Sequence, residues 1–191
     1  FGEFEYWFAM IKIAVIVGFL IIGVLLWLGV LPASGFVGFD NVRESGFAPN
    51  GVAGIAAGLL AVAFAFGGIE VVTIAAAESE DPADNVKRAV NSIIWRIAIF
   101  YLGSVAVITL LLPYATIDGA DSAADSPFTA VLEMANIPGA AAFMEVVIVL
   151  ALLSAFNAQL YGTSRLGYQQ ALEGDAPKWM AKTNANNVPM N

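Results

Sequence analysis

Four long apolar stretches, separated by shorter polar ones, run through the sequence. They cover approximately residues 6–31, 51–77, 93–112 and 139–161. Each supplies the about 20 mainly apolar residues that an α-helix needs to cross the hydrocarbon core of a bilayer. The pattern therefore predicts an all-α membrane protein with four transmembrane helices, in which residues 1–191 form part of a single transmembrane domain.

Basic residues distinguish the two sides of the membrane. On one predicted side lie Lys87, Arg88, Arg96, Arg165, Lys178 and Lys182, and on the other lies only Arg43. Because Lys and Arg are enriched in cytoplasmic loops, we expect the connection between the second and third stretches to be cytoplasmic. Residues 162–191 are then a cytoplasmic connector, and the first helix begins in the cytoplasm.

The composition agrees with a membrane protein and excludes several kinds of chemistry. Hydrophobic residues make up 59% of the chain, against about 45–50% in soluble domains. The sequence contains neither cysteine nor histidine, which excludes disulfides, thiolate nucleophiles and the commonest metal ligands. A net charge of −8 disfavours nucleic acid as a partner. We expect neither a bound metal nor an organic cofactor.

The second apolar stretch is interrupted near its middle by two glycines. Its sequence over residues 61–79 is AVAFAFGGIEVVTIAAAES. Gly67 and Gly68 could let a neighbouring helix pack closely, as small residues often do in membranes. Alternatively, since glycine lowers helix propensity by about 1 kcal/mol, the pair could unwind the helix. An unwound segment leaves backbone N–H and C=O groups able to bind a charged or zwitterionic small molecule.

Two of the charged side chains in the apolar stretches, Glu70 and Lys12, lie well inside them. Glu70 follows the glycine pair, and it faces either a solvated or substrate-linked cavity or a structural hydrogen bond to a neighbouring helix, since a carboxylate exposed to lipid is costly. Lys12 lies roughly 9 Å along the first helix from Tyr6 at 1.5 Å per residue. Lys12 either extends its ammonium to the interface or binds and releases a proton during a functional cycle.

The few polar and charged residues in the apolar stretches also disfavour enzymatic activity. An intramembrane enzyme built on Glu70 would need a second acid at comparable depth, and the apolar stretches contain no plausible pair. Ser154 and Asn157 in the fourth stretch are either hydrogen-bonding residues between helices or the polar lining of a cavity.

The first residue is Phe1, and apolar sequence follows almost at once. We therefore expect a fragment whose partners include the missing helices of the same polypeptide.

Four segments together resemble the bacterial amino-acid permeases of the amino acid–polyamine–organocation superfamily. These segments are FGEFEYWFAMIKI, FAFGGIEVVTIAAAESEDP, AVNSIIWRIAIFYLGS and SAFNAQLYGTSRL, in that order along the chain. Permeases of this family have about twelve helices, ten of them in two inverted five-helix repeats. The resemblance implies that this chain corresponds to helices five to eight of that ten-plus-two-helix fold, with a discontinuous helix in the second span.

The resemblance also implies roles for individual residues. The substrate-binding residues would be Phe64, Ala65, Phe66, Gly67 and Gly68, with Phe64 as an aromatic lid and the others supplying open backbone. Glu70 would be linked to gating. Lys12 would place its ammonium where related carriers bind a sodium ion, with Ser154 near the same position. These two residues would then couple transport to protons, the proton being the coupling ion.

The implied function is proton-coupled import of an amino acid across the bacterial inner membrane. The segments EVVTIAAAES, NSIIWRI, NIPGAAAFME and GDAP look most similar to those of 4-aminobutyrate permeases, so 4-aminobutyrate or another neutral amino acid is the expected substrate. Permeases for aromatic amino acids, proline and D-serine share much of this framework. An amino-acid exchanger of the same superfamily, or a channel or structural membrane subunit, are the alternative functions.

Overall fold

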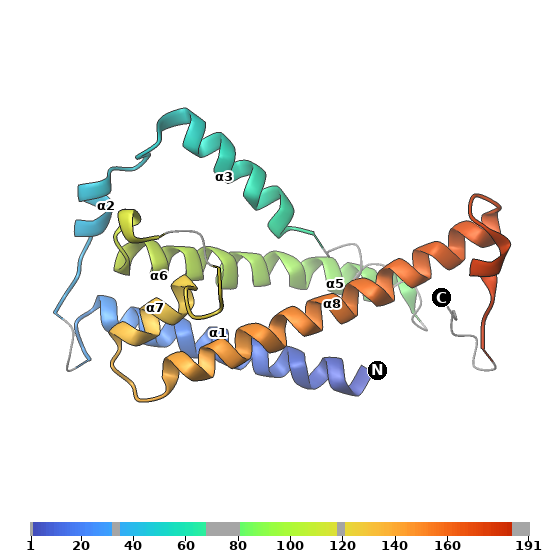
Figure 1. The fold of residues 1–191 in the computed structure, drawn as a ribbon, viewed down its shortest axis with the longest axis horizontal. Coiled ribbons are helices and arrows are strands. Elements are labelled where there is room, and N and C mark those ends of the chain that lie inside the picture. Colours follow the sequence, from blue (N-terminus) through green and yellow to red (C-terminus); the bar gives the residue numbers. More distant parts are fainter. Residues whose placement is uncertain (1, 32–34, 68–80, 118–120, 185–191) are drawn as a thin grey trace. The chain divides into compact units, whose positions relative to one another are not determined.

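The computed structural model describes residues 2–31, 35–67, 81–117 and 121–184. In these ranges the secondary structure is helical, with no strand, as expected for an all-α protein (Figure 1). The chain divides into two compact units. The first comprises Phe1–Gly67 and Val90–Ala151, and the second comprises Gly68–Ala89 and Leu152–Asn191.

Three described helical segments are long and apolar enough to cross a membrane. They are Tyr6–Trp27 within α1 (Gly2–Trp27), Pro82–Leu111, and Ala140–Glu173, which is α8. The segment Pro82–Leu111 consists of α5 (Pro82–Arg96), the π-helical η1 (Ile97–Leu102) and α6 (Gly103–Leu111). These helices overlap three of the four apolar stretches. The number of spans and the inverted repeat stay predictions.

The remaining apolar stretch begins as a helix at its predicted start. Helix α3 (Gly51–Ala65) has 15 residues, which at 1.5 Å per residue gives roughly 22 Å and is too short to cross the bilayer unaided. Residues 68–80 of the predicted second span lie outside the described parts of the chain.

Two helices extend beyond the apolar stretches into polar sequence. Helix α5 begins at Pro82, so residues 82–92 are helical although they read as a polar connection. Helix α8 continues past residue 161 to Glu173, where Gly174 follows with a φ of 93°. The backbone N–H groups of Asp175 and Ala176 then donate to the carbonyl of Gln170 at 2.9 and 3.2 Å. The short helix η3 (Lys178–Ala181) follows this turn.

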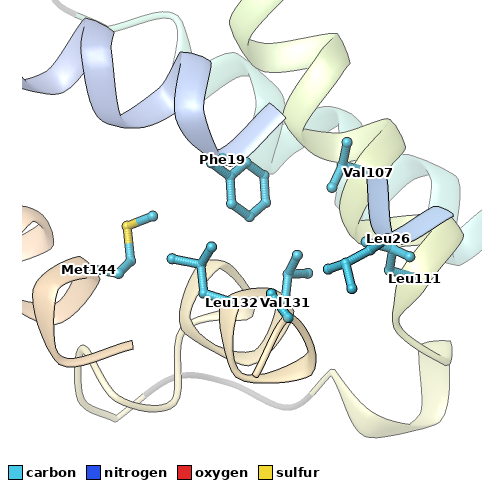
Figure 2. Close-up of a cluster of buried hydrophobic side chains, with 8 residues drawn as sticks. Phe19, Leu26, Val107, Leu111, Val131, Leu132 and Met144 are labelled. Atoms are coloured by element: carbon cyan, nitrogen blue, oxygen red, sulfur yellow. The ribbon is translucent and has the colours of Figure 1, made fainter. Parts of the chain in front are cut away.

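The core of the first unit lies where α1, α6, the start of α8 and helix α7 (Pro127–Met134) meet (Figure 2). Its buried residues are Phe19, Leu26, Val107, Leu111, Val131, Leu132, Ala135 and Met144. The rings of Phe19 and Phe128 are 4.8 Å apart between centroids. Two short helices, α2 (Asp40–Ser45) and η2 (Tyr114–Thr116), flank the end of α6.

Helix α7 lies in a connection that the hydrophobic pattern marks as polar. Ser126 caps it by accepting a hydrogen bond from the Phe128 N–H at 3.3 Å, and Pro127 occupies the first turn, a common arrangement at helix starts. The positions 128, 131, 132 and 135 are spaced as one helix face. This face packs into the core, with Val131 fully buried.

The close approach of α1 and α6 depends on a glycine, and substitution there tests the packing. A Cβ at Gly23 would overlap the side chain of Val107, which is stiff because it is β-branched. We expect Gly23→Ala to lower stability by about 1–3 kcal/mol through overpacking. Gly18→Ala on the same helix is the matched control, because a Cβ there meets nothing within 4 Å. Equal thermal midpoints for the two purified variants of the full-length protein would contradict this packing.

Candidate substrate-binding site

Helix α3 ends one residue before the glycine pair. Its last residue is Ala65, and Phe66 follows with φ −84° and ψ −4°. The Phe66 N–H donates to the carbonyl of Val62 at 3.3 Å, and the Gly67 N–H donates to the carbonyl of Phe64 at 3.0 Å. The second of these bonds spans only three residues, so the helix tightens and stops here. The predicted discontinuity continues into residues 68–80, which lie outside the described residues, so it stays a prediction.

Gly67 is suited to this tight turn. A Cβ at Gly67 would lie 3.1 Å from the carbonyl oxygen of Phe64, closer than an ordinary van der Waals contact. A side chain would therefore push against the carbonyl that closes the turn. Gly68 and Glu70, which the sequence also predicts at this site, lie outside the described residues.

The aromatic residues at the end of α3 differ in their surroundings. The side chain of Phe64 is 80% exposed, whereas that of Phe66 is 38% exposed. Phe66 packs against Tyr101, with ring centroids 6.2 Å apart and planes at 78°, an edge-to-face contact. Tyr101 belongs to η1. At the other end of α3, the Asn50 side-chain amide donates to the Tyr114 hydroxyl at 2.6 Å.

These two contacts attach the C-terminal end of α3 to η1 and its N-terminal end to η2. Tyr101 precedes α6 and Tyr114 follows it. From Tyr101 to Leu111 the helix rises roughly 15 Å at 1.5 Å per residue, and the extended residues Leu112 and Pro113 then lead to Tyr114, so the two contacts lie about one length of α3 apart. Helix α3 therefore runs antiparallel to α6, and its broken end lies at the level of η1.

Tyr101 is a residue that the hydrophobic pattern did not single out. The sequence did carry a signal, because Tyr101 is an aromatic residue with a hydroxyl in the middle of the apolar stretch 93–112, whereas Tyr and Trp in membrane helices favour the interfaces. The contact of Tyr101 with Phe66 depends on the position of α3. Only the structure supplies that position.

The two predicted proton-coupling residues lie in different units. Lys12 is half-buried on α1 in the first unit. Ser154 is fully buried on α8 in the second unit. Their proposed proximity, and their role in proton coupling, stay predictions.

Cavities in the first unit are formed by other residues. One, of about 340 Å³, lies between α2 and the end of α6 and is lined by residues including Asn41, Phe47 and Tyr114. Another, of about 320 Å³, is apolar and is bordered by α1, α7 and α8. Within the described parts of the chain, no group of three or more acidic side chains is placed to hold a metal ion.

Comparison with known proteins identifies the family. All 191 residues match the amino acid permease family. The chain is 63% identical to the aromatic amino acid transport protein AroP of Corynebacterium glutamicum, with 100% of this chain and 42% of the relative covered. It is 41% identical to the gamma-aminobutyric acid permease of Bacillus subtilis, covering 100% of this chain and 40% of that protein.

A third relative is the lysine-specific permease LysP of Escherichia coli, 40% identical over 100% of this chain and 40% of the relative. The chain thus spans about two fifths of the length of the curated relatives it matches. No solved structure gave a significant match. The relatives are transporters rather than enzymes, and the chain belongs to the amino acid permease family.

Proposed function

We propose that this chain is part of a secondary active transporter that imports a neutral amino acid across the bacterial inner membrane, coupled to protons. The observation that carries the proposal is the match of all 191 residues to the amino acid permease family. The apolar helices α1 and α8 and the segment Pro82–Leu111 support a membrane location. Because the relatives are longer, we also propose that transport requires further helices of the same polypeptide.

An aromatic amino acid is our first proposal for the substrate. The 63% identity to a protein named for aromatic amino acid transport exceeds the 41% identity to a gamma-aminobutyric acid permease. The segments that resemble 4-aminobutyrate permeases keep 4-aminobutyrate as the second candidate. Both molecules carry an ammonium and a carboxylate at neutral pH, so the same backbone groups could bind either.

The end of α3 is the proposed centre of binding. A helix C-terminus carries partial negative charge from carbonyl groups beyond the last hydrogen bonds, and this favours the ammonium of an amino acid. We propose that Phe64, Ala65, Phe66, Gly67 and Gly68 contact the substrate. Alternating access would then open this site to each side of the membrane in turn, with Glu70 contributing to gating.

Proton coupling is proposed to reside in Lys12 and Ser154. Lys12 lies within the part of α1 that is long and apolar enough to cross the membrane. An amine in such a place can exchange a proton when its surroundings change between inward-open and outward-open states. No other coupling ion is required by this scheme.

Uptake by the full-length permease tests the proposed function. We expect purified protein in liposomes to accumulate labelled phenylalanine when an inward proton gradient is imposed, with weaker uptake of 4-aminobutyrate and none of lysine. Empty liposomes and a gradient collapsed by a protonophore are the controls. Uptake that requires preloaded substrate would instead identify an exchanger, and non-saturating conductance would identify a channel.

A further inference from the structure

A π-helical turn interrupts the membrane helix beside the end of α3. The segment η1, Ile97–Leu102, separates α5 from α6. A π turn contains an additional residue, which turns the following side chains by roughly 100° relative to an uninterrupted α-helix. Such turns are rare in proteins overall, and those that occur are frequently found at functional sites. The π turn therefore helps to set which neighbouring residues the side chains of η1 face.

Packing on the far side of this turn is tight. Gly103, the first residue of α6, lies against α1, since a Cβ there would be 3.1 Å from Leu20. Its N–H donates to the carbonyls of Ile99 and Phe100, so helical hydrogen bonding continues from η1 into α6. Ser104 and Val107 on the next turns are buried. The end of η1 is thus held by α1, and the position of Tyr101 follows from that packing.

From this position Tyr101 contacts the residue that follows α3. Its ring meets that of Phe66 edge to face, one residue beyond the end of α3. Tyr101 lies ten residues before Leu111, which at 1.5 Å per residue is roughly 15 Å, or half the hydrocarbon thickness. In the predicted span 93–112 this places the contact near the middle of the membrane, the depth proposed for the substrate site.

We propose that Tyr101 is a positioning residue that orients Phe66 and, through it, sets affinity and selectivity for the substrate's side chain. The inference rests on the proposed function of the site at the end of α3. An edge-to-face contact restrains the ring that it touches, so Phe66 presents a defined surface to a bound amino acid. A substrate with a large apolar side chain depends on this surface more than 4-aminobutyrate does.

The decisive variants separate the ring of Tyr101 from its hydroxyl. Tyr101→Leu removes the aromatic contact and is expected to raise the KM for phenylalanine about two- to tenfold, with a smaller change for 4-aminobutyrate and a nearly unchanged maximal rate. Tyr101→Phe keeps the ring and is expected to retain the wild-type KM. Leu102→Ala is the matched control, because Leu102 lies on the same turn with its side chain 66% exposed.

Action through Phe66 is tested by combining substitutions. Contacting residues show non-additive effects, whereas independent ones add. We expect Tyr101→Leu to have no further effect on the KM for phenylalanine in a Phe66→Leu background. Size-exclusion chromatography of each purified variant confirms that transport is measured on folded protein.

The results that would overturn the role of Tyr101 differ from the result that would overturn the proposed function. A wild-type KM in Tyr101→Leu, an equal effect of Leu102→Ala, or additive effects of the Phe66 and Tyr101 substitutions would each exclude positioning through this contact while leaving amino-acid transport intact. Absence of uptake by the wild-type permease would overturn the proposed function itself and the inference with it.

Discussion

Replacement of Lys12 by methionine is expected to abolish proton-driven accumulation of the substrate. Methionine has a similar length and suits the apolar surroundings of α1, but it cannot carry a proton. If Lys12 couples transport to protons, the variant should still bind substrate and exchange it across the membrane, without concentrating it. The measurement is uptake of labelled phenylalanine into liposomes with and without an inward proton gradient.

Two further variants separate proton binding from simple extension of Lys12 to the interface. Lys12→Arg keeps a positive charge that stays protonated in proteins, so it should also lose accumulation if the proton must leave. An arginine that only extends to the interface would serve as well as lysine. Lys87→Met, at an exposed position of α5, is the matched control. Full accumulation by Lys12→Met or Lys12→Arg would exclude a coupling role for this residue.

Substitution of Phe19 by alanine is expected to have the largest effect on stability. The side chain of Phe19 is 1% exposed and packs on Phe128 of α7. Its removal would leave a cavity between α1 and α7 and cost about 3–5 kcal/mol. The measurement is the thermal midpoint of the purified full-length permease.

A neighbouring position on α1 supplies the control. Ile21 is 56% exposed, so Ile21→Ala removes a side chain of comparable chemistry without opening the core of the first unit. We expect a much smaller loss of stability in this variant. A midpoint for Phe19→Ala equal to that of Ile21→Ala would contradict the packing of α7 against α1.

The apolar pattern predicted the main helices because membrane helices depend on a simple requirement. A run of about 20 apolar residues satisfies both the bilayer and the backbone within one segment. Tyr6–Trp27, Pro82–Leu111 and Ala140–Glu173 meet this requirement. The glycine pair that follows α3 was a local signal for one of two alternatives, an unwound segment, because glycine weakens a helix wherever it lies. Four sequence segments resembled those of amino-acid permeases, and the comparisons confirmed that the chain belongs to the amino acid permease family.

Helix α7 was missed although its sequence contained usable signals. Ser126 and Pro127 are typical of a helix start, and the apolar residues after them have helical spacing. The surrounding acidic and small residues made the whole connection read as polar loop. Because α7 is only 8 residues long, it depends on burial against α1 and α6 rather than on its own propensity.

The sequence by itself determined which segments are apolar and which family the chain resembles, and its glycine pair indicated a weak point in the second apolar stretch, since these depend on composition and local conformational preference. The tertiary structure alone decided that η1 forms a π turn and that Tyr101 meets Phe66. These features depend on contacts between residues far apart in sequence: Gly103 packs on Leu20, and the ends of α3 attach to Tyr114 and Tyr101. A hydrophobic pattern records how apolar each position is, and it carries no information about which distant side chain will lie beside it.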